Sequence, residues 1–335
     1  MHTLIAPSVR QRPWLLPVAL LAAGAALVAC SDAGTPTHPV APVAPSLGKN
    51  IGGSNQRILF SGDIEISANY ELYSMNPDGT GITRLTNSPA FDSDGAWSPD
   101  GKRIAFASDR DRPGGDIYVM NADGTNVVRL TSGPGSTGAP SWSKDGKQIV
   151  FTSTRDGANP STFSHDDLEI YVMNADGGGI KRLTDNHVMD ASPVWSPDGR
   201  QLAFVSRRDH PGTETSDLYV MNVDGTSVTR LTNQTGWATS PSWDPHSRRI
   251  AFSVDDGAAD LGIFTIMPDG TGLKRLTLND VSHDQEPSWS ADGSALAYAC
   301  SQGGHAQVCS IKADGTGRAQ LTNGFGQHIA VLWTR

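Results

Sequence analysis

Three aspartates stand at the same place relative to a tryptophan, and their carboxylates could bind a cation or a basic ligand. Asp92, Asp190 and Asp284 each lie five residues before a tryptophan. If the segments that carry them surround one axis, the three side chains would converge at one end of it. Aspartate is also a common loop residue that bonds nearby backbone N–H groups. The sequence therefore leaves two interpretations open, an acidic binding site and a set of loop caps.

Neighbouring positions add apolar and imidazole side chains to the same predicted face. Phe91, Met189 and Trp237 would form an apolar patch, and aromatic residues are enriched where partners bind; Trp237 could equally pack under a loop of its own repeat. A metal centre would need three or four ligands brought together, and the spacing leaves that undecided. The predicted binding face comprises Phe91, Asp92, Met189, Asp190, Trp237, His283, Asp284 and His328.

These residues belong to a repeat that runs through most of the chain. A segment of the type Met-Asn-x-Asp-Gly-Thr recurs six times, with its aspartate at positions 78, 123, 176, 224, 269 and 314. Arg-Leu-Thr or a close variant follows, with leucine at 85, 130, 183, 231, 276 and 321. A tryptophan comes next, at 97, 142, 195, 243, 289 and 333. The landmarks step by 44 to 53 residues, which is typical of a four-stranded propeller blade.

Apolar runs and turn signals divide each repeat into strands. Segments such as IAFAS (104–108) and IYVMN (117–121) are continuous apolar runs, as in strands buried on both faces. Ser98-Pro99-Asp100-Gly101 has the residue pattern of a type I turn. The first strand, 57–61, has no tryptophan strand before it, whereas 328–335 supplies one at the end. We predict an all-β, six-bladed propeller of four-stranded blades over residues 55–335, closed by the C-terminal strand joining the N-terminal blade.

The repeat can also be compared with known families. The run W-S-P-D-G-x-x-I-A-F-x-S, followed by I-Y-V-M-N-x-D-G and R-L-T, resembles the TolB-like, or PD40, propeller repeat. The resemblance covers residues 56–335. It implies a location in the cell envelope and binding to other proteins. The extra N-terminal domain of TolB proteins has no counterpart in residues 31–54, which are few and polar.

The first thirty residues predict export. Arg10 and Arg12 precede an apolar stretch, 14–29, that is short for a membrane span. The stretch ends in Leu-Val-Ala-Cys, which resembles a bacterial lipobox and implies that Cys30 is lipidated. We predict a signal peptide at 1–29, then the lipidated cysteine and a flexible Pro/Ala-rich tether to residue 54, with the lipid as sole membrane anchor. Ser31, in place of aspartate, favours the outer membrane.

The net charge and the cysteines indicate which partners and which cellular compartment are compatible with the sequence. The net charge is −9 and Lys and Arg do not cluster, which argues against a nucleic-acid partner. Cys300 and Cys309 fall on adjoining predicted strands. Antiparallel neighbours can be bridged outside the cytoplasm, so a disulfide is one expectation and a pair of buried thiols the other.

The combined pattern favours a non-catalytic protein-binding or scaffold module without a cofactor. The sequence has no G-x-S-x-G elbow, phosphate loop or zinc-protease motif. Two alternatives remain. One is a metal-dependent hydrolase or lyase that uses the aspartates and histidines at the channel mouth. The other is a propeller that binds a small ligand or glycan, with Trp237 stacking on a sugar.

Overall fold

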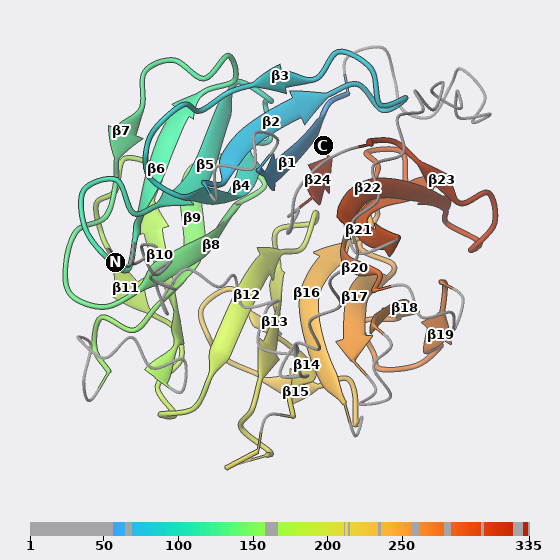
Figure 1. The fold of residues 1–335 in the computed structure, drawn as a ribbon. Coiled ribbons are helices and arrows are strands. Elements are labelled where there is room, and N and C mark those ends of the chain that lie inside the picture. The colour runs from blue at the N-terminus through green and yellow to red at the C-terminus, as the bar shows by residue number, and fades with distance from the viewer. Residues whose placement is uncertain are drawn as a thin grey trace, which may run out of the picture.

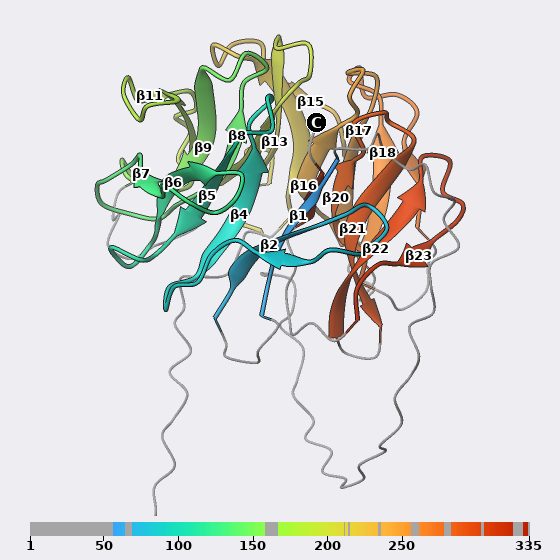
Figure 2. The same ribbon diagram turned by 90° about the horizontal axis from the view of Figure 1, so that it is seen from above.

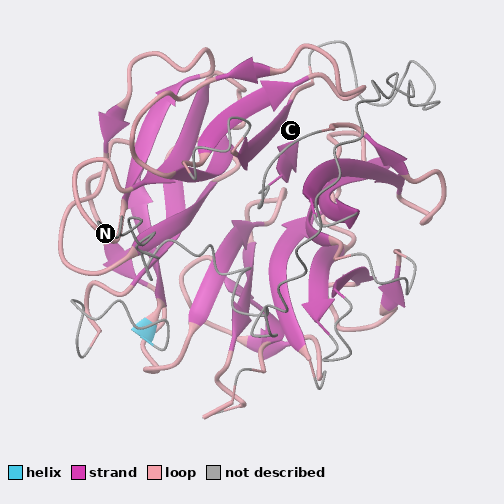
Figure 3. Ribbon diagram, viewed as in Figure 1, coloured by secondary structure: helices cyan, strands magenta, loops and turns pink. Residues whose placement is uncertain are grey.

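A computed structural model describes residues 56–63, 69–157, 167–210, 212–213, 215–233, 236–255, 261–277, 283–302, 305–323 and 331–333. Over these ranges the chain consists almost entirely of strands and loops (Figure 3). The strands form six four-stranded antiparallel sheets arranged around a central axis (Figure 1). No helix within the described ranges is long and apolar enough to cross a bilayer. The predicted six-bladed propeller is confirmed.

Each blade runs from an innermost strand at the axis to a two-residue strand at the rim. The innermost strands are β24 (Val331–Trp333), β4 (Asp92–Trp97), β8 (Thr137–Trp142), β12 (Asp190–Trp195), β16 (Trp237–Trp243) and β20 (Gln285–Trp289). The second strands are β1 (Ile58–Gly62), β5 (Arg103–Ser108), β9 (Gln148–Ser153), β13 (Gln201–Ser206), β17 (Ile250–Asp255) and β21 (Ala295–Gln302).

The outer half of each blade follows the same order. The third strands are β2 (Glu71–Met75), β6 (Asp116–Asn121), β10 (Glu169–Asn174), β14 (Asp217–Asn222), β18 (Leu261–Ile266) and β22 (His305–Lys312). The fourth strands are β3 (Thr83–Arg84), β7 (Val128–Arg129), β11 (Lys181–Arg182), β15 (Thr229–Arg230), β19 (Lys274–Arg275) and β23 (Ala319–Gln320). We number the blades 1 to 6 from the one that contains β1.

The core is divided among the interfaces between blades. Among the described residues, six clusters of buried apolar side chains lie mainly between two adjacent blades, and the one between blades 4 and 5 also includes Leu168 of blade 3. In the cluster between blades 2 and 3, for example, Ile117 of β6 packs with Phe151 of β9 and Trp142 of β8. Both faces of the inner strands are therefore covered, which explains why their sequences are continuous apolar runs.

The ring closes through the last strand. In β24, Trp333 pairs with Ile58 of β1, and Val331 pairs with Phe60. The Trp333 N–H donates to Ser288 Oγ of blade 6 at 3.0 Å. Figures 1 and 2 both show the first strands of the chain beside the last ones. The predicted closure by the C-terminal strand is confirmed, and it pairs an edge that would otherwise be open.

The Asp-Gly-Thr turns fix the distance between blades. Asp123 accepts hydrogen bonds from the backbone N–H and hydroxyl of Thr125, which closes the turn between β6 and β7. Gly124 has a φ of +86°, and a Cβ there would lie 2.3 Å from the carbonyl oxygen of Leu85 in blade 1. The glycine is thus required both by its backbone conformation and by the neighbouring blade.

The threonine of each Arg-Leu-Thr segment joins the fourth strand to the third. In blade 2, Thr131 Oγ1 accepts a hydrogen bond from Ile117 N–H at 2.9 Å. The corresponding threonines in the other blades make the same bond: Thr86, Thr184, Thr232, Thr277 and Thr322. The two-residue fourth strand is therefore anchored by a side chain as well as by its short ladder.

Candidate functional site: the central channel

The six innermost strands enclose a cavity of about 500 Å³. At one end, the turn face, it is bordered by the turns that follow the tryptophans, including Pro99, Lys144 and Pro245. At the other end, the crossover face, it is bordered by the connections between blades, including Phe91 and Ser136. The cavity therefore extends along the axis and touches both faces of the disc.

One position in each of five innermost strands presents a side chain under backbone strain. The pairing of β4, β8, β12, β16 and β20 shifts register by an extra residue, a β-bulge. The bulged residue lies three before the tryptophan and has a φ of +50° to +57° in every case: Asp94, Ala139, Ser192, Ser240 and Glu286. All five line the cavity, and we call them the channel ring.

The strain in the channel ring is unusual for these residue types. Ala139, Ser192, Ser240 and Glu286 each precede a proline, which by itself disfavours helical conformations of the residue before it. A positive φ in a residue other than glycine costs about 1–3 kcal/mol and persists only where the surroundings impose it. Such residues cluster at functional sites. The ring is therefore the strongest structural pointer to a site in the described chain.

Two members of the ring are acidic. Burial raises the pKa of Glu286 to about 8, and the nearby charge of Asp94 adds to the shift. Burial also raises the pKa of Asp94, against the lowering effect of a hydrogen bond from Ala139 N–H at 3.2 Å. Solvent reaches part of both side chains, but protein surrounds them, so their charges are poorly hydrated.

Glu286 has unused hydrogen-bonding capacity. Its Oε2 is buried and has no hydrogen-bond partner among the described residues, while its backbone N–H donates to Ser253 Oγ at 2.9 Å. A basic group that entered the channel would meet two carboxylates and would stabilise their charged forms. The ring can therefore bind a cationic or hydrogen-bonding group.

The three predicted aspartates do not reach the axis. Asp92, Asp190 and Asp284 are completely buried, and none lines the cavity. Arg110 donates to both carboxylate oxygens of Asp92 at 2.9 Å, and Arg208 donates to Asp190 at 2.8 Å. Asp284 receives a bond of 3.1 Å from Arg318. The expected convergence is not found, because each carboxylate turns into its own blade to pair with an arginine.

The predicted apolar patch is mostly buried as well. Met189 is fully buried in the cluster between blades 4 and 5. Trp237 is 7% exposed and lies under the guanidinium of Arg207, 5.1 Å from the ring centroid. Trp237 therefore packs within the fold and is unavailable to a partner or a sugar. Phe91 does line the channel and stacks on Tyr70 with centroids 5.5 Å apart.

Within the ranges that the structure describes, the histidines do not assemble into a site. His283 is exposed, and His328 lies outside the described residues, as does Cys30. His210 contacts Asp217 through Nε2 at 2.7 Å. In the part of the chain that the structure describes, no three side chains of histidine, cysteine, aspartate or glutamate are grouped to hold a metal ion.

Cys300 and Cys309 are joined by a disulfide, with their Cα atoms 5.8 Å apart. Cys300 lies in β21 and Cys309 in β22, on adjacent strands of blade 6. Both residues are buried between blades 5 and 6. The bridge therefore links the second and third strands of blade 6, and Cys300 lies two residues before the end of β21.

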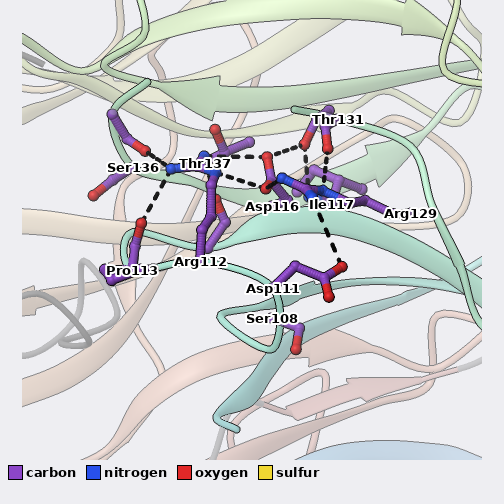
Figure 4. Close-up of polar contacts among 12 residues, drawn as sticks. Ser108, Asp111, Arg112, Pro113, Asp116, Ile117, Arg129, Thr131, Ser136 and Thr137 are labelled. Carbon is purple, nitrogen blue, oxygen red and sulfur yellow. Dashed lines mark hydrogen bonds and ion pairs between the residues drawn. The ribbon is translucent and has the colours of Figure 1, made fainter. Parts of the chain in front are cut away.

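Acidic residues at the start of the third strands complete the polar framework. In blade 2, Asp116 accepts hydrogen bonds from Arg112, Arg129 and Thr131 at 2.5 to 2.8 Å (Figure 4). Glu71, Glu169 and Asp217 likewise pair with the arginine of their own Arg-Leu-Thr segment. These ion pairs, each with a buried carboxylate and a partly exposed arginine, hold the rim of blades 1 to 4 and belong to the scaffold.

The fold and the channel ring together define a six-bladed propeller with TolB-like repeats. Residues 211–331 match the PD40 family, described as the TolB beta propeller domain. A 143-residue segment is 30% identical to "Protein TolB homolog" of Chlorobium chlorochromatii; it covers 42% of this chain and 30% of that protein. The match thus spans less than a third of that relative.

Solved structures give the same architecture. TolB from Acinetobacter baumannii superposes with a TM-score of 0.70 and 25% identity, over 83% of this chain and 66% of that chain. An oligogalacturonate lyase in complex with manganese superposes with a TM-score of 0.54 and 17% identity, over 79% and 73% of the two chains. The second likeness concerns the fold alone.

The sequence did not lead to Asp94 and Glu286 as predicted site residues. A signal was present, because the third residue before each tryptophan is small or hydroxyl-bearing in Ala139, Ser192 and Ser240 and acidic in these two. The bulge hid it. An extra residue in the strand changes which side chains face the axis, and the predicted aspartates, five residues before the tryptophan, do not face it.

Proposed function

We propose that this protein is a non-catalytic binding module of the bacterial cell envelope, held there by a lipid on Cys30. The observation that carries the proposal is the strained channel ring, whose two carboxylates project into an axial cavity that opens beside Phe91. The likeness to TolB supports a binding role for the propeller. The partner is a protein that inserts a basic side chain at the crossover end of the channel.

The binding role is tested by site-specific photocrosslinking in cells. A photoreactive residue in place of Phe91, at the channel mouth, should crosslink a discrete partner. The same residue in place of Met267, which is 47% exposed on the turn face, should not. Asp94→Asn and Glu286→Gln together should reduce the Phe91 crosslink at least about tenfold, which corresponds to the loss of one charge-assisted contact. Equal crosslinking from both positions would contradict the proposed face.

The anchor is tested separately. Mass spectrometry of the mature protein should find Cys30 at the N-terminus, carrying acyl chains, and a Cys30→Ser variant should appear in the soluble fraction. If the Cys30→Ser variant stayed on membranes, the proposed lipid anchor would be contradicted. The proposed binding site in the channel would not be affected. A stoichiometric metal in protein purified without chelator would instead favour the metal-dependent enzyme.

A further inference from the structure

One polar motif is repeated after the second strand in three successive blades. Its sequence is Ser-x-Arg-Asp, at 108–111, 153–156 and 206–209. In blade 2 the Arg110 guanidinium lies over Phe106 and Tyr118, with its carbon 5.2 and 5.0 Å from the ring centroids, and its Nε donates to Ser108 Oγ. The aspartate of the motif accepts a bond from the same tyrosine hydroxyl. Each motif thus holds one guanidinium in a fixed place.

Blade 4 repeats this arrangement closely. Arg208 lies over Phe204 and Tyr219 at 5.2 and 5.1 Å, and its Nε donates to Ser206 Oγ at 3.0 Å. In both blades Nη2 of the guanidinium donates to a buried carboxylate, Asp92 or Asp190. The carboxylate comes from the first residue of the innermost strand, which pairs with the serine of the motif.

Blade 3 has the same arginine without the carboxylate. Arg155 lies over Phe151 and Tyr171 at 5.1 and 5.3 Å, and its Nε donates to Ser153 Oγ at 3.3 Å. The residue opposite Ser153 is Thr137, which offers only a hydroxyl, bonded to Ser153 at 2.9 Å. Among the described residues, no carboxylate forms an ion pair with Arg155.

The environment of Arg155 is costly for an unpaired cation. Burial lowers its pKa, and electrostatic interactions with Tyr171, Asp156 and Asp116 only partly offset that effect. Asp156 is committed to the Tyr171 hydroxyl at 2.9 Å. A partly buried charge without a counter-charge loses hydration without a compensating ion pair. An anion from outside the chain would give Arg155 the ion pair that the equivalent arginines of blades 2 and 4 already have.

We propose that Arg155, which is partly exposed, binds the carboxylate of a ligand from outside the chain, through the guanidinium donors that Asp92 and Asp190 engage in the neighbouring blades. A carboxylate fits because the two equivalent guanidinium groups of this chain already take one there. Charge-assisted hydrogen bonds of this type are about twice as strong as neutral ones. The carboxylate could belong to a small organic acid or to an acidic peptide side chain, and the experiment separates these.

The test follows the arginine side-chain signals by NMR while acetate replaces chloride at constant ionic strength. The Arg155 signal should shift and saturate. The Arg110 signal should not, because its carboxylate is internal, so it serves as a control within the same molecule. Thr137→Asp should supply the missing carboxylate and weaken acetate binding at least about tenfold. The neutral Thr137→Asn variant should bind acetate as the original chain does.

Other results would overturn the site. An Arg155 signal that does not move, or that drifts linearly as the Arg110 signal does, would show that no carboxylate binds. So would a Thr137→Asp variant, folded by its spectrum, that titrates unchanged. A blocked aspartyl peptide distinguishes the sources: binding tighter than acetate points to a protein, and equal binding points to a small acid. Acetate binding needs no partner, so failure of the proposed envelope function would leave this result unaffected.

Discussion

Glu286 is the residue whose charge the channel changes most. Its pKa in the folded protein is about 8, against an ordinary value of 4.5. Between these values the folded state holds a proton that the unfolded chain has released, so unfolding becomes easier as the pH rises. The destabilisation is absent below about pH 4.5 and complete above about pH 8. The charged Glu286 side chain thus lowers the free energy of unfolding at alkaline pH. Such a destabilising group is expected where the side chain serves binding.

The Glu286→Gln variant should therefore be more stable than the original chain, and increasingly so as the pH rises. We expect a gain of about 2 to 4 kcal/mol at pH 9 and little gain at pH 4.5. Urea unfolding at the two pH values measures the difference. A gain of the same size at both would mean that packing, and not ionisation, distinguishes the two side chains.

At the level of single residues, the sequence was informative only about composition. It showed aspartates five residues before three of the six tryptophans, but Arg110 and Arg208, which pair with two of them, lie across a strand pair and were not connected to them. The recurring Ser-x-Arg-Asp run could have suggested that link. The direction of each side chain depends on the bulge, which no local pattern in these sequences announces.

The turns show why the elements repeat so regularly. Each Asp-Gly-Thr turn closes on itself through its aspartate, and its glycine rests against a carbonyl of the preceding blade. Gly79 makes the corresponding contact with Leu321, so the series also crosses the closure between blades 6 and 1. The period of the sequence and its turn residues predicted the blades correctly because both are local. The contact between blades is not local, and the sequence did not reveal it.

Substitutions at two glycines distinguish the energetic cost of the contact between blades from the cost of a positive φ. Gly124 and Gly101 both have positive φ values, +86° and +67°, but nothing lies within 4 Å of a Cβ built on Gly101. Gly101→Ala should cost about 1 kcal/mol from the conformation alone, and Gly124→Ala roughly 1–3 kcal/mol more from the clash with Leu85. Denaturant unfolding of both variants tests this. Equal losses would show that the blades adjust without cost.

For the whole molecule, stability depends on closing the ring. Trp333 and Val331 fill the interface between blades 6 and 1 together with Ile58 and Phe60. Every other blade is a continuous piece of chain, whereas blade 1 combines the two ends of the propeller. The sequence predicted this correctly, because the first repeat lacked a tryptophan strand and the last segment supplied one.

Substitutions in β24 measure the contribution of closure. Trp333 is 1% exposed, and Trp333→Ala should cost about 3–5 kcal/mol. Leu332, the neighbouring residue on the same strand, is exposed, and Leu332→Ala should change stability by about 0.5 kcal/mol or less. Thermal unfolding and gel filtration should show a less stable, association-prone Trp333→Ala variant. If the two variants behaved alike, β24 would contribute little to the ring.

The same closure sets an order of events during synthesis. A ribosome or a translocon delivers a chain from its N-terminus, so β1 emerges early and its partner β24 emerges last. Until then blade 1 has an unpaired edge, and the contact that completes it joins the most distant parts of the domain, which slows folding. The edge of β1 therefore stays exposed until β24 has been synthesised. A chaperone that shields strand edges would be needed most at that stage.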